Sequence, residues 1–188
     1  MKTLFTNAAQ IVTCNTNDVK FKRGKDLSDI DVLENHSIVV EDGIIKDILP
    51  YYSTSNIQID KKISLSGKVI LPGLIDCHTH TAFAGSRANE FREKIAGVHY
   101  EDIAKRGGGI NTTVTAIRIS SLTELVELIK PRVKEFIAQG VTTLEIKSGY
   151  GLDFENEIKL LHAIKIINEI FPIDIVSTFL GAHTFQNK

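Results

Sequence analysis

Short apolar runs separated by polar loops fill the first third of the chain and predict β-structure. One run extends from Leu4 to Thr13, and two further Ile- and Val-rich runs, His36 to Glu41 and Gly43 to Leu49, flank the dipeptide Asp42-Gly43. That dipeptide is typical of a tight hairpin turn. The segment Asp18 to Asp31 is charged and lacks periodicity, so we expect a surface loop there. Residues 1–67 are therefore predicted to form a small antiparallel β-domain.

From Lys68 onward the pattern changes to apolar runs separated by helical spacing, which is typical of strand-helix-strand units. Val69 to Ile75 is predicted to be a buried strand with an irregular middle at its Pro-Gly pair. Val141 to Ser148 and Ile173 to Leu180 are predicted to be the second and third strands, parallel to the first. Residues 68–188 are therefore expected to form an α/β domain.

Two helices are predicted between these strands. Ser121 and Glu124 have the spacing of a capping box, and Gly140 is expected to end the first helix. Asp153 is expected to cap the second, in which apolar residues recur at helical spacing up to Phe171. Three strands joined by such helices fit either an open doubly wound sheet or a (β/α)₈ barrel, and periodicity does not choose between them.

Composition and charge exclude several classes of protein. The 188 residues are 43% hydrophobic and carry a net charge of −1, with 22 basic residues interleaved among 23 acidic ones, so we expect no nucleic-acid partner. No apolar stretch approaches the roughly 18 residues that a membrane span requires. The first residues lack the apolar core of a signal peptide, so we expect a cytoplasmic protein in which Cys14 and Cys77 are reduced.

Each predicted α/β strand is followed by polar residues that are suited to chemistry. The segments are Asp76 to His80, Lys147 to Gly151 and Gly181 to His183. Because the carboxyl ends of parallel strands share one edge of a sheet, we expect the three segments to converge there.

His78 and His80 are the candidate metal ligands. Residues two apart on a strand project from the same face, so two imidazoles can bind one ion at about 2.0 to 2.1 Å each. A His-x-His sequence also arises by chance and is weak evidence alone. Its position directly after an apolar strand, at the edge where sites are built, favours the metal role.

Three further residues have open interpretations. Arg87 follows the histidines in a loop of small residues, where a guanidinium either clamps a carboxylate bidentately or remains a solvated surface group. Tyr150, between two glycines, either hydrogen-bonds a ligand or packs as a loop aromatic. His183 is a general base, a general acid, a substrate donor or a satisfied core histidine.

Other patterns have simpler explanations. Gly107 to Gly109 precede a predicted helix start and form a possible anion nest, but they lack the Lys-Ser/Thr of a phosphate-binding loop. Glu145 and Lys147 alternate on one strand, which predicts an ion pair inside a barrel. His162 is expected to be solvated.

The string PGLIDCHTH, Pro72 to His80, resembles the first barrel strand of the amidohydrolase superfamily, which comprises metal-dependent hydrolases with a β-sandwich beside a (β/α)₈ barrel. Within that superfamily the chain most closely resembles the imidazolonepropionase family. This second resemblance lies in four segments: Cys77 to Phe91, Gly107 to Ile110, Thr143 to Asp153 and Thr178 to His183.

The resemblance implies a fold, an activity and site residues. It implies a part of a β-sandwich followed by the first half of a (β/α)₈ barrel, and hydrolysis of 4-imidazolone-5-propanoate to N-formimidoyl-L-glutamate in histidine degradation. It implies that His78 and His80 bind a single Zn²⁺ or Fe³⁺ ion. The substrate is implied to be held by Arg87, Tyr150 and His183, with Tyr100 as a weaker addition, and His183 is implied to assist proton transfer.

The chain departs from that family in length. Members also use a His and an Asp from later barrel strands, whereas this sequence stops at Lys188, after about half of a barrel of roughly 250 residues. We therefore expect the chain alone to be incomplete and inactive. The alternatives are another amidohydrolase that acts on a cyclic amide, or a noncatalytic fragment that serves in assembly. Apart from the small-molecule substrate, a second copy of the chain in a homodimer is a candidate partner.

Overall fold

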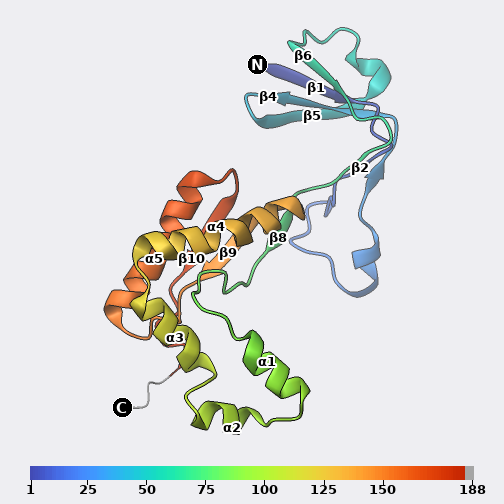
Figure 1. The fold of residues 1–188 in the computed structure, drawn as a ribbon. Coiled ribbons are helices and arrows are strands. Elements are labelled where there is room, and N and C mark those ends of the chain that lie inside the picture. Colours follow the sequence, from blue (N-terminus) through green and yellow to red (C-terminus); the bar gives the residue numbers. More distant parts are fainter. Residues whose placement is uncertain (185–188) are drawn as a thin grey trace. The chain divides into compact units, whose positions relative to one another are not determined.

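The computed structural model describes residues 1–184, which divide into two units between Pro72 and Gly73 (Figure 1). The first unit contains β-strands and two short 3-10 helices, and the second contains strands and all the α-helices of the described residues. The chain is thus an α/β protein, as predicted. None of the helices in the described residues combines the length and apolar character that a membrane crossing requires.

The larger sheet of the first unit has the order β5-β4-β1-β6. Its strands are β1 (Lys2–Thr6), β4 (His36–Glu41), β5 (Ile44–Pro50) and β6 (Lys61–Ser64). The predicted hairpin is confirmed: Asp42 and Gly43 both have positive φ, 50° and 82°, between antiparallel β4 and β5. The expectation of a purely antiparallel sheet was wrong, because β6 pairs with β1 in parallel.

The second sheet of this unit joins three short strands, in the order β3-β2-β7. They are β2 (Gln10–Val12), β3 (Val32–Leu33) and β7 (Val69–Ile70). The predicted single run from Leu4 to Thr13 is divided between the two sheets, because the chain turns at Asn7, whose φ is 59°. The charged segment is a largely exposed loop, as predicted, with a 3-10 helix at Gly24–Ser28; a second follows at Tyr51–Thr54.

The sheet of the second unit contains three parallel strands in the order β10-β9-β8. The strands are β8 (Leu74–Asp76), β9 (Val141–Lys147) and β10 (Asp174–Thr178). The parallel register places Thr178 opposite Lys147, so the strands end at one edge and the segments that follow them emerge together.

The prediction of one buried strand from Val69 to Ile75 was wrong. The run is divided between β7 and β8, which belong to different sheets and different units. Pro72 lacks an N–H group and cannot donate to a sheet ladder, which favours a break at this point. Val69 is 48% exposed and Ile75 69% exposed in the described residues, because both lie in strands at sheet edges.

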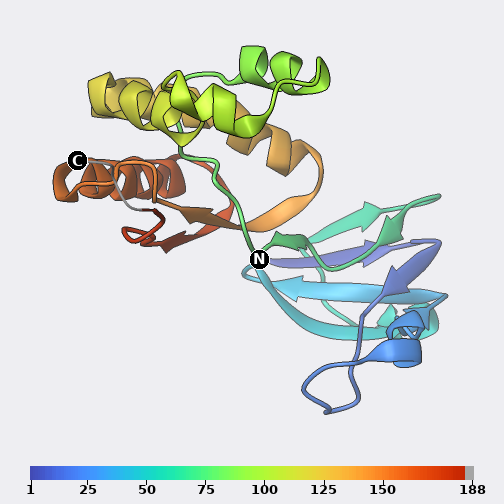
Figure 2. The same ribbon diagram turned by 90° about the horizontal axis from the view of Figure 1, so that it is seen from below.

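Two long helices, α4 (Leu122–Ala138) and α5 (Phe154–Ile170), pack against each other and against β9 and β10 (Figure 2). The core joins apolar residues of these elements, among them Ile129, Leu144 and Leu160, each fully buried. The capping box of Ser121 and Glu124 is present at the start of α4, and Asp153 accepts a hydrogen bond from Asn156 N at the start of α5. Both predicted caps are therefore confirmed.

Three helices between β8 and α4 were not predicted as such, although a helix start was considered near Gly109. They are α1 (Ala88–Ile95), α2 (Tyr100–Lys105) and α3 (Ile110–Ile119). The first buries no residue and the second buries only Ile103, so neither has an apolar stripe of helical period. The third is rich in Thr, Ile and Val, residues that favour strands when local preference is considered alone.

Candidate functional site

The three segments that follow the parallel strands converge, as the sequence predicted. The ring centroid of His80, after β8, lies 5.0 Å from that of Tyr150, after β9, and 5.0 Å from that of His183, after β10. The Tyr150 and His183 centroids are 5.2 Å apart, and the His80 and His183 rings are nearly parallel, at 17°. Three elements distant in sequence thus supply one cluster of polar rings.

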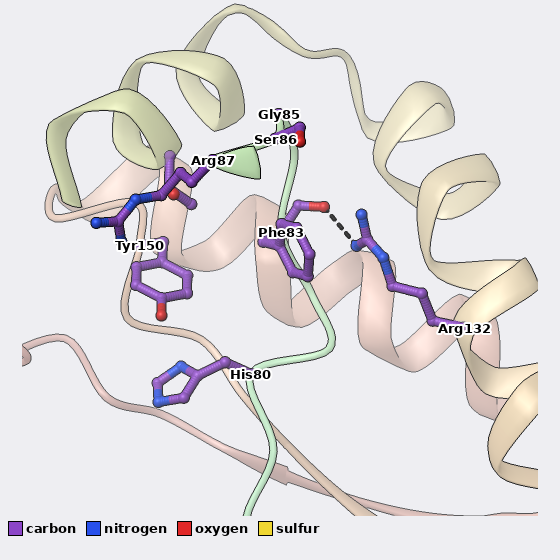
Figure 3. Close-up of a pocket in the computed structure, with 8 residues that line it drawn as sticks. His80, Phe83, Gly85, Ser86, Arg87, Arg132 and Tyr150 are labelled. Atoms are coloured by element: carbon purple, nitrogen blue, oxygen red, sulfur yellow. Dashed lines mark hydrogen bonds between the residues drawn. The ribbon is translucent and has the colours of Figure 1, made fainter. Parts of the chain in front are cut away.

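A pocket of about 530 Å³ lies beside this cluster (Figure 3). Figure 3 shows His80 and Tyr150 at one side of the pocket, Arg87 above the Tyr150 ring, and Phe83 and Arg132 at the other side. The residues that line it are His80, Phe83, Gly85, Ser86, Arg87, Thr113, Arg132 and Tyr150. The size suits a small molecule, and aromatic and cationic groups face the same space.

The predicted metal ligands, His78 and His80, lie beyond the end of β8 at Asp76, so the two residues are not on the strand itself. Their ring centroids are 5.7 Å apart in an edge-to-face arrangement. Two imidazoles that share one tetrahedral ion at about 2.0 to 2.1 Å have centroids about 5 Å apart, which is close to the observed separation.

Two features of His80 suit a metal ligand. Its Nδ1 atom is buried and has no hydrogen-bond partner among the described residues. Burial, and then the neighbouring His183, His78 and Lys147, lower the pKa of His80 below its usual value, which favours the neutral ring. A metal binds the neutral ring, so the orphaned nitrogen and the lowered pKa both fit a metal role.

The described part of the chain does not bring three or more His, Cys, Asp or Glu side chains together as a complete metal site. His78 is exposed, and His80 is partly buried. A catalytic zinc usually has three protein ligands. His78 and His80 therefore offer two nitrogen ligands, and a catalytic zinc would need at least one more protein ligand.

Thr79, between the two histidines, is fixed to β9 by Glu145. The Thr79 N–H donates to Glu145 Oε2 at 3.0 Å, and its hydroxyl donates to the Glu145 carbonyl at 2.6 Å. Lys147 N donates to the Thr79 carbonyl at 3.0 Å, which extends the pairing beyond the end of β8. The predicted ion pair of Glu145 with Lys147 is present, so this carboxylate holds both the lysine and the histidine segment.

His183 is held in one orientation by the loop that follows β9. Its Nδ1 lies 2.9 Å from the Gly149 carbonyl oxygen. A carbonyl only accepts, so Nδ1 donates, and in the neutral ring Nε2 carries the lone pair. The structure thus leaves Nε2 of His183 able to accept a proton or a hydrogen bond, as a base or an orienting group requires.

Arg87 contacts a carboxylate of the chain itself. Its Nε donates to Glu90 Oε2 at 2.7 Å, and its side chain, 39% exposed, lines the pocket. Glu90 also accepts from Gly109 N and from the Thr112 hydroxyl, at 3.1 and 2.8 Å. Of the three glycines considered as an anion nest, Gly109 donates to Glu90, whereas Gly107 N and Gly108 N donate to the Ala104 and Ile103 carbonyls, so the glycines do not form the nest.

The remaining predicted residues lie apart from the cluster. Tyr100, at the start of α2, is 49% exposed and is not among the pocket's lining residues in the described chain; Lys94 Nζ lies 5.6 Å from its ring centroid. His162 is exposed, as predicted, and the thiols of Cys14 and Cys77 are free.

Sequence reasoning missed the residues that brace this site. Arg132, in α4, donates to the carbonyls of Thr81 and Phe83 at 2.9 and 2.6 Å and lies 3.5 Å from the Phe83 ring centroid. No local pattern marks Arg132, because its partners are about 50 positions away. Glu90 was also missed, although it lies three residues after Arg87, a spacing that is typical of an ion pair on a helix.

Comparison with known proteins shows similarity in sequence along nearly the whole chain. An imidazolonepropionase from Clostridium tetani is 45% identical over 96% of this chain, and one from Brevibacillus brevis is 43% identical over 97%. The chain spans 43% and 44% of these two relatives, or about two fifths of their length. No protein-family profile matches the chain.

Similarity to solved structures extends to other hydrolases at low identity and indicates the fold alone. Escherichia coli guanine deaminase superposes with a TM-score of 0.58 at 15% identity, covering 94% of this chain and 35% of that protein. An atrazine chlorohydrolase from Arthrobacter aurescens, complexed with zinc, superposes with a TM-score of 0.53 at 14% identity and the same coverage of both chains.

Proposed function

Because this chain is homologous to the imidazolonepropionases over nearly its whole length, we propose that it forms part of an enzyme that hydrolyses 4-imidazolone-5-propanoate to N-formimidoyl-L-glutamate. One structural observation carries the proposal: His80, Tyr150 and His183, from three strand ends, meet beside a pocket that Arg87 also lines. The substrate has a polar ring and a carboxylate, and the pocket presents polar rings and a guanidinium.

We propose that His78 and His80 hold one Zn²⁺ or iron ion. The orphaned Nδ1 of His80 and its lowered pKa support this role, and imidazole suits both metals. The zinc in the related-fold atrazine chlorohydrolase agrees with it. Such an ion, when bound, supplies Lewis-acid polarisation of a carbonyl and makes water more acidic.

The chain's own residues bind the substrate and transfer protons. The terminal nitrogens of Arg87 pair with the propanoate, because its Nε is already bonded to Glu90. The phenol of Tyr150 hydrogen-bonds the ring, and Tyr100, which is not among the lining residues in the described chain, is a weaker candidate for the same contact. Hydrolysis places the water oxygen on the ring carbonyl carbon and breaks the C–N bond, and the leaving nitrogen gains a proton. The free Nε2 of His183 is placed to carry that proton.

We further propose that the two units correspond to a part of a β-sandwich and to the first half of a (β/α)₈ barrel. Two small sheets in the first unit and three parallel strands with helices packed on them in the second support this assignment. Because the described residues supply only two metal ligands, the 188-residue chain by itself should bind the ion weakly and show little or no turnover.

A replacement experiment tests the proposed function. In a chimera, residues 1–188 of this chain replace the matching segment of the Clostridium tetani imidazolonepropionase. The loss of 4-imidazolone-5-propanoate is then followed. The chimera should hydrolyse the substrate, its H80A variant should be inactive, and H162A, which removes an exposed histidine outside the site, should retain activity. A folded, metal-loaded chimera that hydrolyses a guanine-like ring, or no substrate, would contradict the proposal.

A further inference from the structure

Glu157 is a buried acidic residue to which sequence reasoning assigned no role. It lies in the first turn of α5 and is 2% exposed. Its Oε2 accepts from Gly149 N at 2.8 Å, and its Oε1 accepts from Gly151 N and Leu152 N at 2.7 and 2.9 Å. One carboxylate therefore binds three backbone N–H groups of the loop that carries Tyr150.

The loop depends on this acceptor because its backbone is in an uncommon conformation. Gly149 has φ of +113°, and Leu152, which has a side chain, has φ of +56°. A Cβ at Gly151 would lie 2.6 Å from Asn156 C, so the loop also packs directly on α5. This geometry turns three N–H groups inward, and without the carboxylate they would be buried and unpaired, which is costly.

The same loop sets the geometry of two candidate site residues. Tyr150 is flanked by Gly149 and Gly151, both of which donate to Glu157. The Gly149 carbonyl accepts the hydrogen bond from His183 Nδ1 that leaves Nε2 free. Glu157 therefore acts on both rings through the backbone of Gly149 and Gly151, and within residues 1–184 it makes no hydrogen bond to either ring.

We propose that Glu157 is a positioning residue of this site. Its carboxylate holds residues 149–152 in the conformation that directs the Tyr150 ring toward His80 and keeps His183 protonated on Nδ1, with Nε2 available. The importance of this loop conformation for catalysis rests on the proposed function. The effect of Glu157 on the loop and on the His183 tautomer does not depend on that function.

The test compares Glu157→Gln with Glu155→Gln in the 188-residue chain. Glu155 is exposed in the same helix turn, so its variant removes the same charge from the same helix end and leaves the loop untouched. The imidazole ¹⁵N shifts of His183 report its tautomer and are recorded on the alkaline plateau, where they no longer change with pH and the ring is neutral. Amide hydrogen exchange reports the protection of Gly149, Gly151 and Leu152.

Wild type and E155Q should show His183 with the proton on Nδ1 and all three amides protected. E157Q, in which one oxygen becomes an NH₂ donor that faces N–H groups, should retain its overall amide dispersion while these amides exchange about tenfold faster or more. Its His183 should become a mixture of tautomers. E157D, whose shorter carboxylate keeps the charge, should restore part of the protection.

An E157Q protein that folds with unchanged His183 shifts and unchanged exchange would overturn the proposal. If neither Glu157 variant folds, the wild-type spectrum decides: His183 with its proton mainly on Nε2, or unprotected amides at Gly149 and Gly151, also overturns it. None of these readouts needs substrate or metal. A failed hydrolysis assay would therefore not overturn the role of Glu157 in the loop. Failure of the Glu157 test would likewise not overturn the proposed hydrolysis.

Discussion

The carboxylate of Glu90 provides a quantitative test of how the pocket is built. It accepts from Arg87 Nε at 2.7 Å, from the Thr112 hydroxyl at 2.8 Å and from Gly109 N at 3.1 Å, and its side chain is only 16% exposed. It therefore links α1, which it belongs to, with the first turn of α3 and with the guanidinium at the pocket. We consider the substitution Glu90→Gln, which keeps the shape and removes the charge.

The expected cost follows from these contacts. A hydrogen bond to a charged group contributes roughly 1.5 to 3 kcal/mol. The glutamine still accepts one or two of the hydrogen bonds through its carbonyl, and solvent weakens the pair with the partly exposed Arg87. We therefore expect E90Q to lower the free energy of unfolding by about 1 to 3 kcal/mol at pH 7.

The pH dependence gives a second, independent signature. Burial alone would raise the pKa of Glu90, but the hydrogen bonds from Arg87, Thr112 and Gly109 outweigh it, and the pKa lies below its usual value. A lowered folded-state pKa gives stability that is fully present above the unfolded value of about 4.3 and is lost as the pH falls through the folded value. The difference between wild type and E90Q should therefore be constant near pH 7 and disappear in acid.

Urea unfolding followed by helical circular dichroism measures this effect, because the α-helices of residues 1–184 all lie in the second unit. Glu93→Gln is the matched control: it is in the same helix and removes an ion pair with Arg106 in which the side chains are 42% and 60% exposed. It should cost at most about 1 kcal/mol. Equal losses for E90Q and E93Q, or an E90Q deficit that persists in acid, would refute this account of the network.

Three further substitutions test the elements that place the site. Ser121→Ala removes the acceptor of the α4 capping box and should lower the unfolding free energy by about 1 kcal/mol, whereas Ser121→Asp should not; thermal unfolding compares them. Ile129→Ala, at a fully buried position, should cost about 2 to 5 kcal/mol in urea unfolding, and Leu128→Ala, at 39% exposure, clearly less. Gly151→Ala places a Cβ 2.6 Å from α5 backbone atoms and should shift the Tyr150 ring resonances; an unchanged spectrum would contradict the packing described.

The sequence predicted those features that depend on local residues. The hairpin at Asp42-Gly43, the caps at Ser121 and Asp153 and the apolar strands β9 and β10 all carry signals within a few positions, and all are present. Parallel strands share an edge, so the meeting of His80 and His183 also followed from topology.

The features that were missed depend on contacts that are distant in sequence. Val69 to Ile75 is uniformly apolar, and only the pairing partners show that it contributes to two sheets. Arg132 reaches carbonyls about 50 positions away, and no spacing rule marks that contact. Glu157 accepts from three N–H groups of a loop in which Leu152 has positive φ, and the sequence does not reveal this loop because leucine has no preference for that conformation.

We propose above all that His78 and His80 together hold a metal ion beside Tyr150 and His183. Zinc titration of the 188-residue chain, followed by imidazole ¹⁵N resonances, tests it most directly. Because the chain offers only two ligands, this binding should be weak: both rings should shift together along one single-site curve that saturates in excess zinc. H78A or H80A should abolish it, and H162A, at an exposed histidine elsewhere, should leave it unchanged. Zinc binding that survives in H80A, or a titration that moves neither ring, would contradict the claim.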